Sequence, residues 1–307
     1  DYDVIDLLLG EPCSDFEPDL GTCNPNVVEP SFAVAKNDSW GVYGDLTWRA
    51  TEQLSVTIGA RYSHDEKDME QNTPYQGDTA VTAALLEDNL LELATTGVLT
   101  ADESWNDFSP RLAVSYNLAD DFMIYGNVSK GYKAGGFNSG PDRPFASLAP
   151  GESQLIADFD PEESLAYEVG FKSTLLDRTL RLNGAIFFID YQNLQVETFK
   201  GLAFAIDNVS DAESKGFELE AQWLASENLE FSLGYSYLDA ELKNGTLADP
   251  DLPGGEVDIS GMAMFNAPEN TLALAAMYSH PTSWGSVDVR LGYSYIDEQL
   301  LADYLLV

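Results

Sequence analysis

The chain has 307 residues, with 15 lysines and arginines against 52 aspartates and glutamates, and a formal net charge of −37. This acidity excludes nucleic-acid binding through a basic surface. The sequence has no run of about 18 apolar residues, so we expect no transmembrane helix. That absence does not exclude a membrane, because β-barrel strands give only a weak signal per segment.

The first segment, residues 1–39, holds nine acidic residues, and we expect it to be an extracellular loop. Cys13 and Cys23 flank nine residues of this segment, and an even pair of cysteines in a loop predicts a disulfide in an oxidising compartment. Such a bridge would stabilise the fold by about 2–3 kcal/mol. Two free thiols are the alternative. The chain begins at Asp1 with no signal peptide, so we expect a missing or processed N-terminus.

From residue 40 onward, apolar and polar residues alternate, as in strands whose two faces meet different surroundings. Along 53–63 one face is apolar or aromatic and carries Leu54, Val56, Ile58, Ala60 and Tyr62. The same pattern predicts ten strands, at 40–50, 53–68, 105–118, 121–138, 161–176, 178–199, 206–224, 229–243, 267–280 and 285–297.

The predicted connections are alternately short and long. Short turns are expected near 50–52, 119–120, 177–178, 225–228 and 281–284, and longer links at 69–104, 139–160, 200–205 and 244–266. Short periplasmic turns and long extracellular loops are typical of an antiparallel transmembrane β-barrel. Aromatic residues beside the short turns would form its interfacial girdle: Trp48, Phe122, Trp223 and Trp284. A soluble sandwich or propeller is the alternative, but its strands usually have about five or six residues.

The long links are acidic and contain few cations, among them Arg143. They form either a solvated rim or a surface that selects cationic or metal-bearing ligands. Within the link 69–104, leucines at helical spacing predict a short helix at 79–97. Residues 298–307 are expected to start the next loop or to be a truncated end.

We expect no enzyme site and no metal site. His64 and His280 are predicted at opposite ends of their strands, and the sequence has no nucleophile elbow, P-loop or zinc spacing. Glu168, Glu218 and Glu220 are interpreted as carboxylates that line a pore, although they could imitate a glycosidase pair.

Four segments resemble the C-terminal barrel of TonB-dependent outer-membrane receptors. They are WGVYGDLTWRATEQLSVTIGARYSHDEKD, YGNVSKGYKAGGFN, FDPEESLAYEVGFKSTLLDRTLRLNGAIFFIDYQNLQV and NVSDAESKGFELEAQWL, in the family's order, and the resemblance covers about 40–297. It implies a 22-stranded barrel with an N-terminal plug in the outer membrane of a Gram-negative bacterium. It also implies uptake of a ferric siderophore, or less often haem, cobalamin or a glycan, powered by the TonB complex, with outer-membrane lipid around the barrel and no cofactor.

The chain departs from that whole, because it has only ten predicted strands, no plug and no TonB box, and ends in LADYLLV. An open ten-strand sheet would leave backbone groups unpaired in lipid, at several kcal/mol each. We therefore expect part of a larger barrel, with a closed ten-strand barrel as the alternative.

The residues near one strand's extracellular end are the candidate ligand contacts: Tyr132, Lys133, Phe137, Asn138 and Arg143. Arg143 could meet a ligand carboxylate or pair with Asp142, and Tyr132 and Phe137 could instead pack within the girdle or loop. Energised import is the expected function. A passive porin and a structural or adhesive surface barrel are the alternatives.

Overall fold

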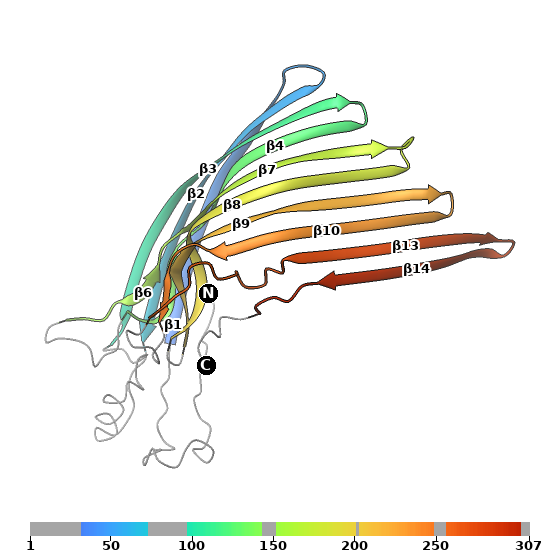
Figure 1. Ribbon diagram of the computed structural model, residues 1–307. Coiled ribbons are helices and arrows are strands. Elements are labelled where there is room, and N and C mark those ends of the chain that lie inside the picture. Colours follow the sequence, from blue (N-terminus) through green and yellow to red (C-terminus); the bar gives the residue numbers. More distant parts are fainter. Residues whose placement is uncertain (1–31, 73–96, 143–151, 201–202, 249–255, 302–307) are drawn as a thin grey trace, which may run out of the picture.

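The computed structural model describes residues 32–72, 97–142, 152–200, 203–248 and 256–301. Every element in this part of the chain is a β-strand, and the main one is a ten-stranded antiparallel sheet in the order β1-β2-β3-β4-β7-β8-β9-β10-β13-β14 (Figure 1). None of the described residues forms a helix that is long and apolar enough to cross a membrane. The predicted all-β, antiparallel fold is confirmed.

The strands of this sheet are long. They are β1 (Phe32–Arg49), β2 (Leu54–Asn72), β3 (Leu99–Ala119), β4 (Phe122–Lys133), β7 (Glu162–Leu175), β8 (Leu180–Lys200), β9 (Ala203–Ser226), β10 (Leu229–Leu242), β13 (Asn270–Thr282) and β14 (Gly285–Ile296). Two small hairpins complete the described fold. They are β5 (Gly136–Pro141) with β6 (Ile156–Phe159), and β11 (Thr246–Ala248) with β12 (Glu256–Asp258).

Several predicted boundaries change. β1 begins at Phe32, so residues 32–39 belong to a strand rather than to the expected loop, and β3 begins at Leu99 rather than at 105. The predicted strand 121–138 is two strands, because the chain leaves the sheet at Ala134 and Gly135. The proposed disulfide and all but the last residue of the helix at 79–97 fall outside the described residues.

The tight turns predicted near 50–52, 119–120, 177–178, 225–228 and 281–284 lie at one end of the sheet (Figure 1). The longer link predicted at 200–205 is wrong, because β8 ends at Lys200 and β9 begins at Ala203, and these two residues pair at the opposite end. In the β7–β8 turn, Leu176, Asp177 and Arg178 all adopt positive φ, at 52°, 52° and 70°. The Thr179 N–H and hydroxyl both donate to the Leu176 carbonyl and close this turn. We call the opposite end of the sheet the outer end.

Strand pairing places like side chains next to one another. Ile58 lies opposite Leu46 on one side and Leu112 on the other, and this apolar face continues across all ten strands. Its residues are exposed in the isolated chain, as in Leu46 at 73%. Contiguous exposed apolar surface of this kind marks contact with lipid or another protein.

The apolar face has a sharp upper limit. Going outward from the tight turns, the apolar stretch of each strand ends on this face at a polar residue, namely Asp38, His64, Asn106, Lys130, Glu163, Asp190, Lys215, Asp239, Asn270 and Asp297. Ser173 of β7 and His280 and Thr282 of β13 are polar residues of the same face that lie nearer the tight turns. The apolar stretch below the upper limit is roughly 7–11 residues long, close to what a tilted strand needs to cross a bilayer. The outer parts of β2, β3, β8 and β9 therefore extend beyond the membrane.

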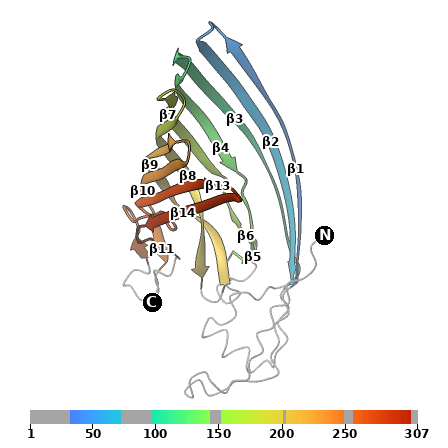
Figure 2. The ribbon, with the colours of Figure 1, turned by 90° about the vertical axis from the view of Figure 1, so that its right-hand side faces the viewer.

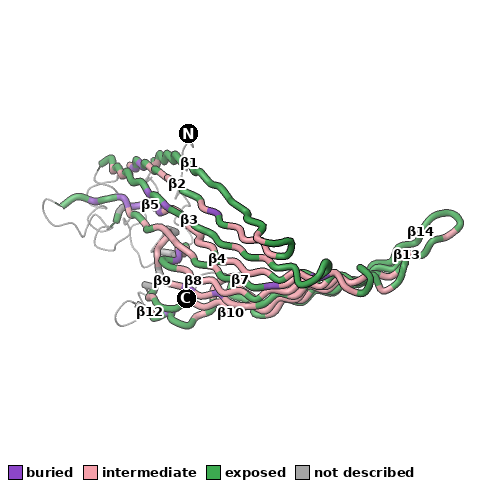
Figure 3. The backbone as a smooth tube through the Cα atoms, turned by 90° about the horizontal axis from the view of Figure 1, so that it is seen from above, coloured by how far each residue is buried: buried purple, intermediate pink, exposed green. Residues whose placement is uncertain are grey.

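The sheet is strongly curved and does not close on itself, since β1 and β14 each pair with one neighbour (Figure 2). The alternative of a closed ten-strand barrel is therefore wrong for the described residues. The few buried side chains gather toward the outer end, while β1 and β14 are exposed along almost their whole length (Figure 3).

Candidate functional site

The small β5–β6 hairpin lies at the outer end of the sheet, on its concave side (Figure 1). It contacts β2, β3 and β9, although β4, β7 and β8 lie between β3 and β9 in the sheet. The sheet must therefore curve toward the hairpin. We call this concave, mostly polar side the inner face, because the residues that meet the hairpin alternate with those of the apolar face.

A cation and two aromatic rings join the hairpin to the wall. The Lys67 ammonium of β2 donates to the Gly135 carbonyl at 2.6 Å and lies 5.6 Å from the Trp105 ring centroid of β3. The Phe137 ring packs against Trp105 with 6.3 Å between centroids. Burial lowers the pKa of Lys67 below its ordinary value; Asp65 opposes this shift and Lys133 adds to it. We call Lys67, Trp105 and Phe137 the mouth cluster.

The two adjacent glycines at the start of β5, Gly135 before the strand and Gly136 as its first residue, permit this close packing. A Cβ at Gly135 would lie 2.5 Å from the Phe159 carbonyl oxygen and 2.9 Å from the Trp105 ring. A Cβ at Gly136 would lie 2.7 Å from the Phe159 ring. The Gly135–Gly136 pair is therefore explained by close approach of β5, β6 and β3.

Polar side chains hold the hairpin on its other flank. The Gln195 amide of β8 donates to the carbonyls of Ala134 and Asp160, each at 3.0 Å. The Asp160 N–H donates to the Asn208 side-chain oxygen at 2.7 Å. Because both flanks are bonded, the hairpin is tied to β2 and β3 on one side and to β8 and β9 on the other.

The backbone pairing of β4 with β3 ends at Arg111 and Ser129. Beyond this point, ion pairs of Lys130 connect β4 to β3 and β7. The Lys130 ammonium donates to Asp107 and Glu163, at 2.8 Å each. Asp107 is only 4% exposed and also accepts from the Ser109 hydroxyl. A buried carboxylate needs such partners, because an uncompensated charge would be strongly destabilising.

The structure brings together some of the predicted ligand contacts. Phe137 belongs to the mouth cluster, and Lys133 is exposed close enough to Lys67 to shift its pKa. The Tyr132 hydroxyl is buried without a hydrogen-bond partner among the described residues, and burial raises the pKa of Tyr132 to about 12. The Asn138 amide is bonded to the backbone of Ile206 in β9. Arg143 lies outside the described residues.

Trp105 and Lys67 are site residues that the sequence reasoning missed. Trp105 shares the inner face with Asp107, Ser109 and Arg111. A lone tryptophan on an otherwise polar strand face was the signal available in the sequence.

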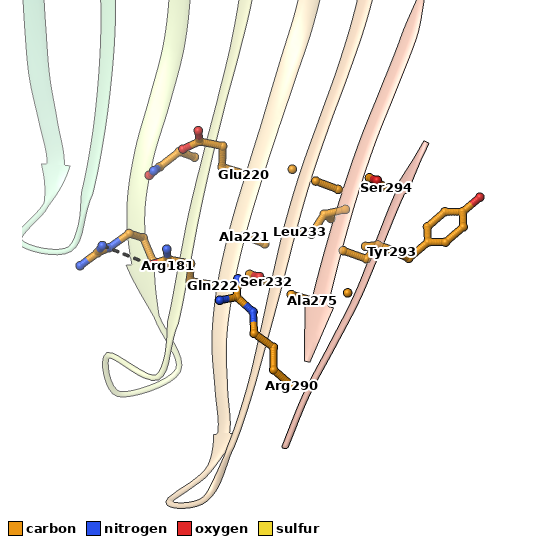
Figure 4. A pocket seen from close by; sticks show the side chains of 15 residues that line it. Arg181, Glu220, Ala221, Gln222, Ser232, Leu233, Ala275, Arg290, Tyr293 and Ser294 are labelled. Atoms are coloured by element: carbon orange, nitrogen blue, oxygen red, sulfur yellow. Dashed lines mark hydrogen bonds between the residues drawn. The ribbon is translucent and has the colours of Figure 1, made fainter. Parts of the chain in front are cut away.

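Closer to the tight turns, the inner wall has a concavity of about 520 Å³ between β8 and β14 (Figure 4). Arg181 of β8, Glu220 and Gln222 of β9 and Arg290 of β14 line it among small side chains such as Ser232. Arg181 donates to the Gln222 side-chain oxygen at 3.3 Å. Glu220 therefore lies on the inner wall, as the pore-lining interpretation predicts.

No group of three or more His, Cys, Asp or Glu side chains suited to a metal ion occurs among the residues that the structure describes. His64 contacts Asn106 beyond the apolar face, whereas His280 lies near the β13–β14 turn. The two histidines are thus at opposite ends of the sheet, as predicted.

The curated proteins whose sequences are similar to this chain include receptors. The pesticin receptor of Yersinia pestis is 25% identical over 207 residues, which are 67% of this chain and 27% of that protein. The ferric-pyoverdine BN7/BN8 receptor of Pseudomonas putida is 28% identical over 240 residues, covering 77% of this chain and 25% of that protein. The chain spans about a quarter of the length of these relatives.

Solved structures share the fold. The ferric yersiniabactin uptake receptor FyuA from Yersinia pestis superposes with a TM-score of 0.65 at 20% identity, covering 87% of this chain and 35% of that one. The siderophore receptor PiuA from Acinetobacter baumannii gives 0.57 at 23% identity, covering 85% and 33%. The family model described as TonB dependent receptor-like, beta-barrel matches residues 6–305. The chain therefore belongs to the β-barrel family of TonB-dependent receptors, which are proteins of the Gram-negative outer membrane.

Proposed function

We propose that this chain is about ten strands of a larger, 22-stranded receptor barrel that imports a ferric siderophore or a similar scarce metal complex. Import is driven by the TonB complex through a plug domain outside this chain. Support comes from the family and from relatives named as receptors for ferric pyoverdine and for metal-pseudopaline. The uncovered edges of β1 and β14 also support a larger barrel, because unpaired backbone groups in lipid cost several kcal/mol each.

One observation carries the ligand-binding part of this proposal. Beyond the membrane band, the β5–β6 hairpin holds the mouth cluster on the inner face, with Lys133 exposed beside it. Cations and aromatic rings suit anionic, ring-bearing metal chelates. Tyr132, Lys133, Phe137 and Arg143 remain the proposed ligand contacts, and Asn138 is proposed to hold the hairpin as well as to lie near the ligand.

A passive channel is the second candidate, because the β5–β6 hairpin contacts β2, β3 and β9 across the inner face and would narrow the outer opening, as a constriction loop narrows a porin. The two functions are separated by uptake of radioactive iron into cells that carry the complete receptor, with and without a protonophore and with TonB deleted. Energised import requires uptake that both treatments abolish. Uptake that survives both, together with steady ion conductance in a planar bilayer, would establish the passive channel instead.

A further inference from the structure

An apolar groove of about 470 Å³ crosses β8, β9, β10, β13 and β14. Its large side chains, such as Trp223 and Phe231, all belong to the apolar face, so the groove opens toward lipid and away from the inner wall. The apolar stretch of β10 runs from Leu229 to Tyr237, and the groove includes Phe231 and Leu233 of it. The groove therefore lies nearer the tight turns, which are periplasmic in transmembrane barrels. We call it the lipid-side groove.

Two alanines leave room for this groove. Strand pairing places Ala276 of β13 between Phe231 of β10 and Leu291 of β14, so that a methyl group stands between two large side chains. Ala221 of β9 is a second small residue of the groove, directly opposite Leu233. A hollow lined by such side chains offers water no hydrogen-bond partner, and hydrocarbon is the solute that suits it.

Aromatic rings give the groove fixed sides. The rings of Trp223 and Phe231 are stacked, with 5.8 Å between centroids and 28° between planes. Tyr293 of β14 lies across the groove from them. Aromatic side chains have few rotatable bonds and large apolar surfaces. The hollow is therefore held open by rigid groups that a flexible hydrocarbon chain can lie against.

Polar groups lie where the headgroup of a bound lipid would begin. Tyr278 and His280 follow Ala276 on the same face of β13, toward the tight turn. The Tyr278 hydroxyl lies 3.4 Å from His280 Nδ1, and the two rings are stacked with 6.2 Å between centroids. A phenol hydroxyl and an imidazole N–H can each donate to a phosphate oxygen. The apolar groove and this polar pair thus follow one another in the order of acyl chain and headgroup in the periplasmic leaflet.

We propose that the lipid-side groove binds an acyl chain of a phospholipid from the periplasmic leaflet, whose phosphate is held by Tyr278 and His280. The occupant is identified by continuity, because the groove is part of the apolar face that meets lipid. The next strand of a larger barrel would pair with the free edge of β14 and extend the wall sideways, which leaves this face open. The site is separate from the inner face and does not depend on which solute the receptor imports.

The test uses the complete receptor in detergent, with phosphatidylethanolamine as the probe and native mass spectrometry to measure its Kd. Ala276→Phe fills the hollow and should raise the Kd about tenfold, as expected when about two methylene groups lose their apolar contact. Val169→Phe makes a matched change on the apolar face of β7, at a position 60% exposed outside the groove, and should leave the Kd unchanged.

Tyr278→Phe tests the headgroup contact with the least change to the fold. It keeps the ring and removes the hydroxyl, and should raise the Kd about fivefold through the loss of one hydrogen bond. An unchanged Kd in this variant would overturn the phosphate contact.

Three further outcomes would overturn the site itself. They are a wild-type receptor that retains no phospholipid, an equal Kd in wild type and Ala276→Phe, and an equal loss in Val169→Phe, which would mean that lipid binds the apolar face as a whole. Retention of lipopolysaccharide or of a second protein in place of phospholipid would show that the occupant is wrong. Energised iron uptake by the wild type tests the proposed import separately from all of these results.

Discussion

Asn138 in β5 and Ile206 in β9 are joined by two hydrogen bonds between one side chain and one backbone unit. The Asn138 amide donates to the Ile206 carbonyl at 2.9 Å, and the Ile206 N–H donates to the Asn138 side-chain oxygen at 2.7 Å. The amide thereby replaces the backbone pairing that a neighbouring strand would provide. This contact ties the hairpin to the far side of the curved wall.

Asn138→Ala should loosen that contact. Losing two hydrogen bonds, with a backbone donor left unpaired, is expected to cost about 1–3 kcal/mol of local stability. Hydrogen exchange at the Ile206 amide measures it, and Asn138→Asp should keep only part of the protection, because its carboxylate still accepts from the Ile206 N–H but cannot donate to the Ile206 carbonyl. Equal protection in wild type and Asn138→Ala would show that the hairpin is held elsewhere.

Gly135→Ala should displace the hairpin. The added Cβ meets the Phe159 carbonyl and the Trp105 ring, and overpacking of this kind costs about 1–3 kcal/mol. The expected result is weaker siderophore binding and a changed tryptophan fluorescence spectrum in the complete receptor. Gly234→Ala in β10 is the control, because its Cβ meets nothing within 4 Å. If both variants behave like the wild type, the close packing at Gly135 is not required.

Lys67 should make stability depend on alkaline pH. Its pKa is lowered, chiefly by burial, so the unfolded chain binds more protons than the folded chain between the lowered pKa and the ordinary 10.5. The free energy of unfolding therefore rises with pH across that interval. Thermal unfolding from pH 7 to about 11 should show a smaller rise in Lys67→Met than in the wild type. An identical pH dependence in the two proteins would contradict the lowered pKa.

The lipid-facing assignment predicts an asymmetry between adjacent residues of β8. Ile186→Arg, at a position 62% exposed on the apolar face, should destabilise the folded receptor by about 2–4 kcal/mol in lipid vesicles. Ala185→Arg faces the other way, opposite Glu218, and should be tolerated. Denaturant unfolding in vesicles measures both. Equal destabilisation would mean that the two faces are not divided between lipid and lumen.

The strands of the barrel wall were predictable because each of them has one face toward lipid and the other toward the barrel lumen. The alternation of apolar and polar residues from Leu54 to Tyr62 identifies the side chains that face lipid. The tight turns are predicted at the positions where this alternation ends. Beyond the membrane both faces meet water, so the signal fades. For that reason the beginnings of β1 at Phe32 and β3 at Leu99 were missed.

The mouth cluster was only partly predictable, for a different reason. Phe137 and Lys133 were found because they lie at or beyond the outer end of a recognised strand. Lys67 and Trp105 belong to β2 and β3. They lie close to Gly135 only because the β5–β6 hairpin packs against the inner face of these strands. Asn138 was expected as a ligand contact, and its bonds to Ile206 depend on the same long-range approach.

The wall strands are very unequal in length. β9 has 24 residues and β14 has 12, a difference of roughly 40 Å along the strand at about 3.3 Å per residue. The outer edge of this part of the barrel is therefore oblique. It extends furthest from the tight turns along β8 and β9 and least far along β13 and β14. A bulky solute that approaches over β13 and β14 therefore reaches the inner face sooner than one that approaches over β8 and β9. The unequal strand lengths thus favour entry from one side.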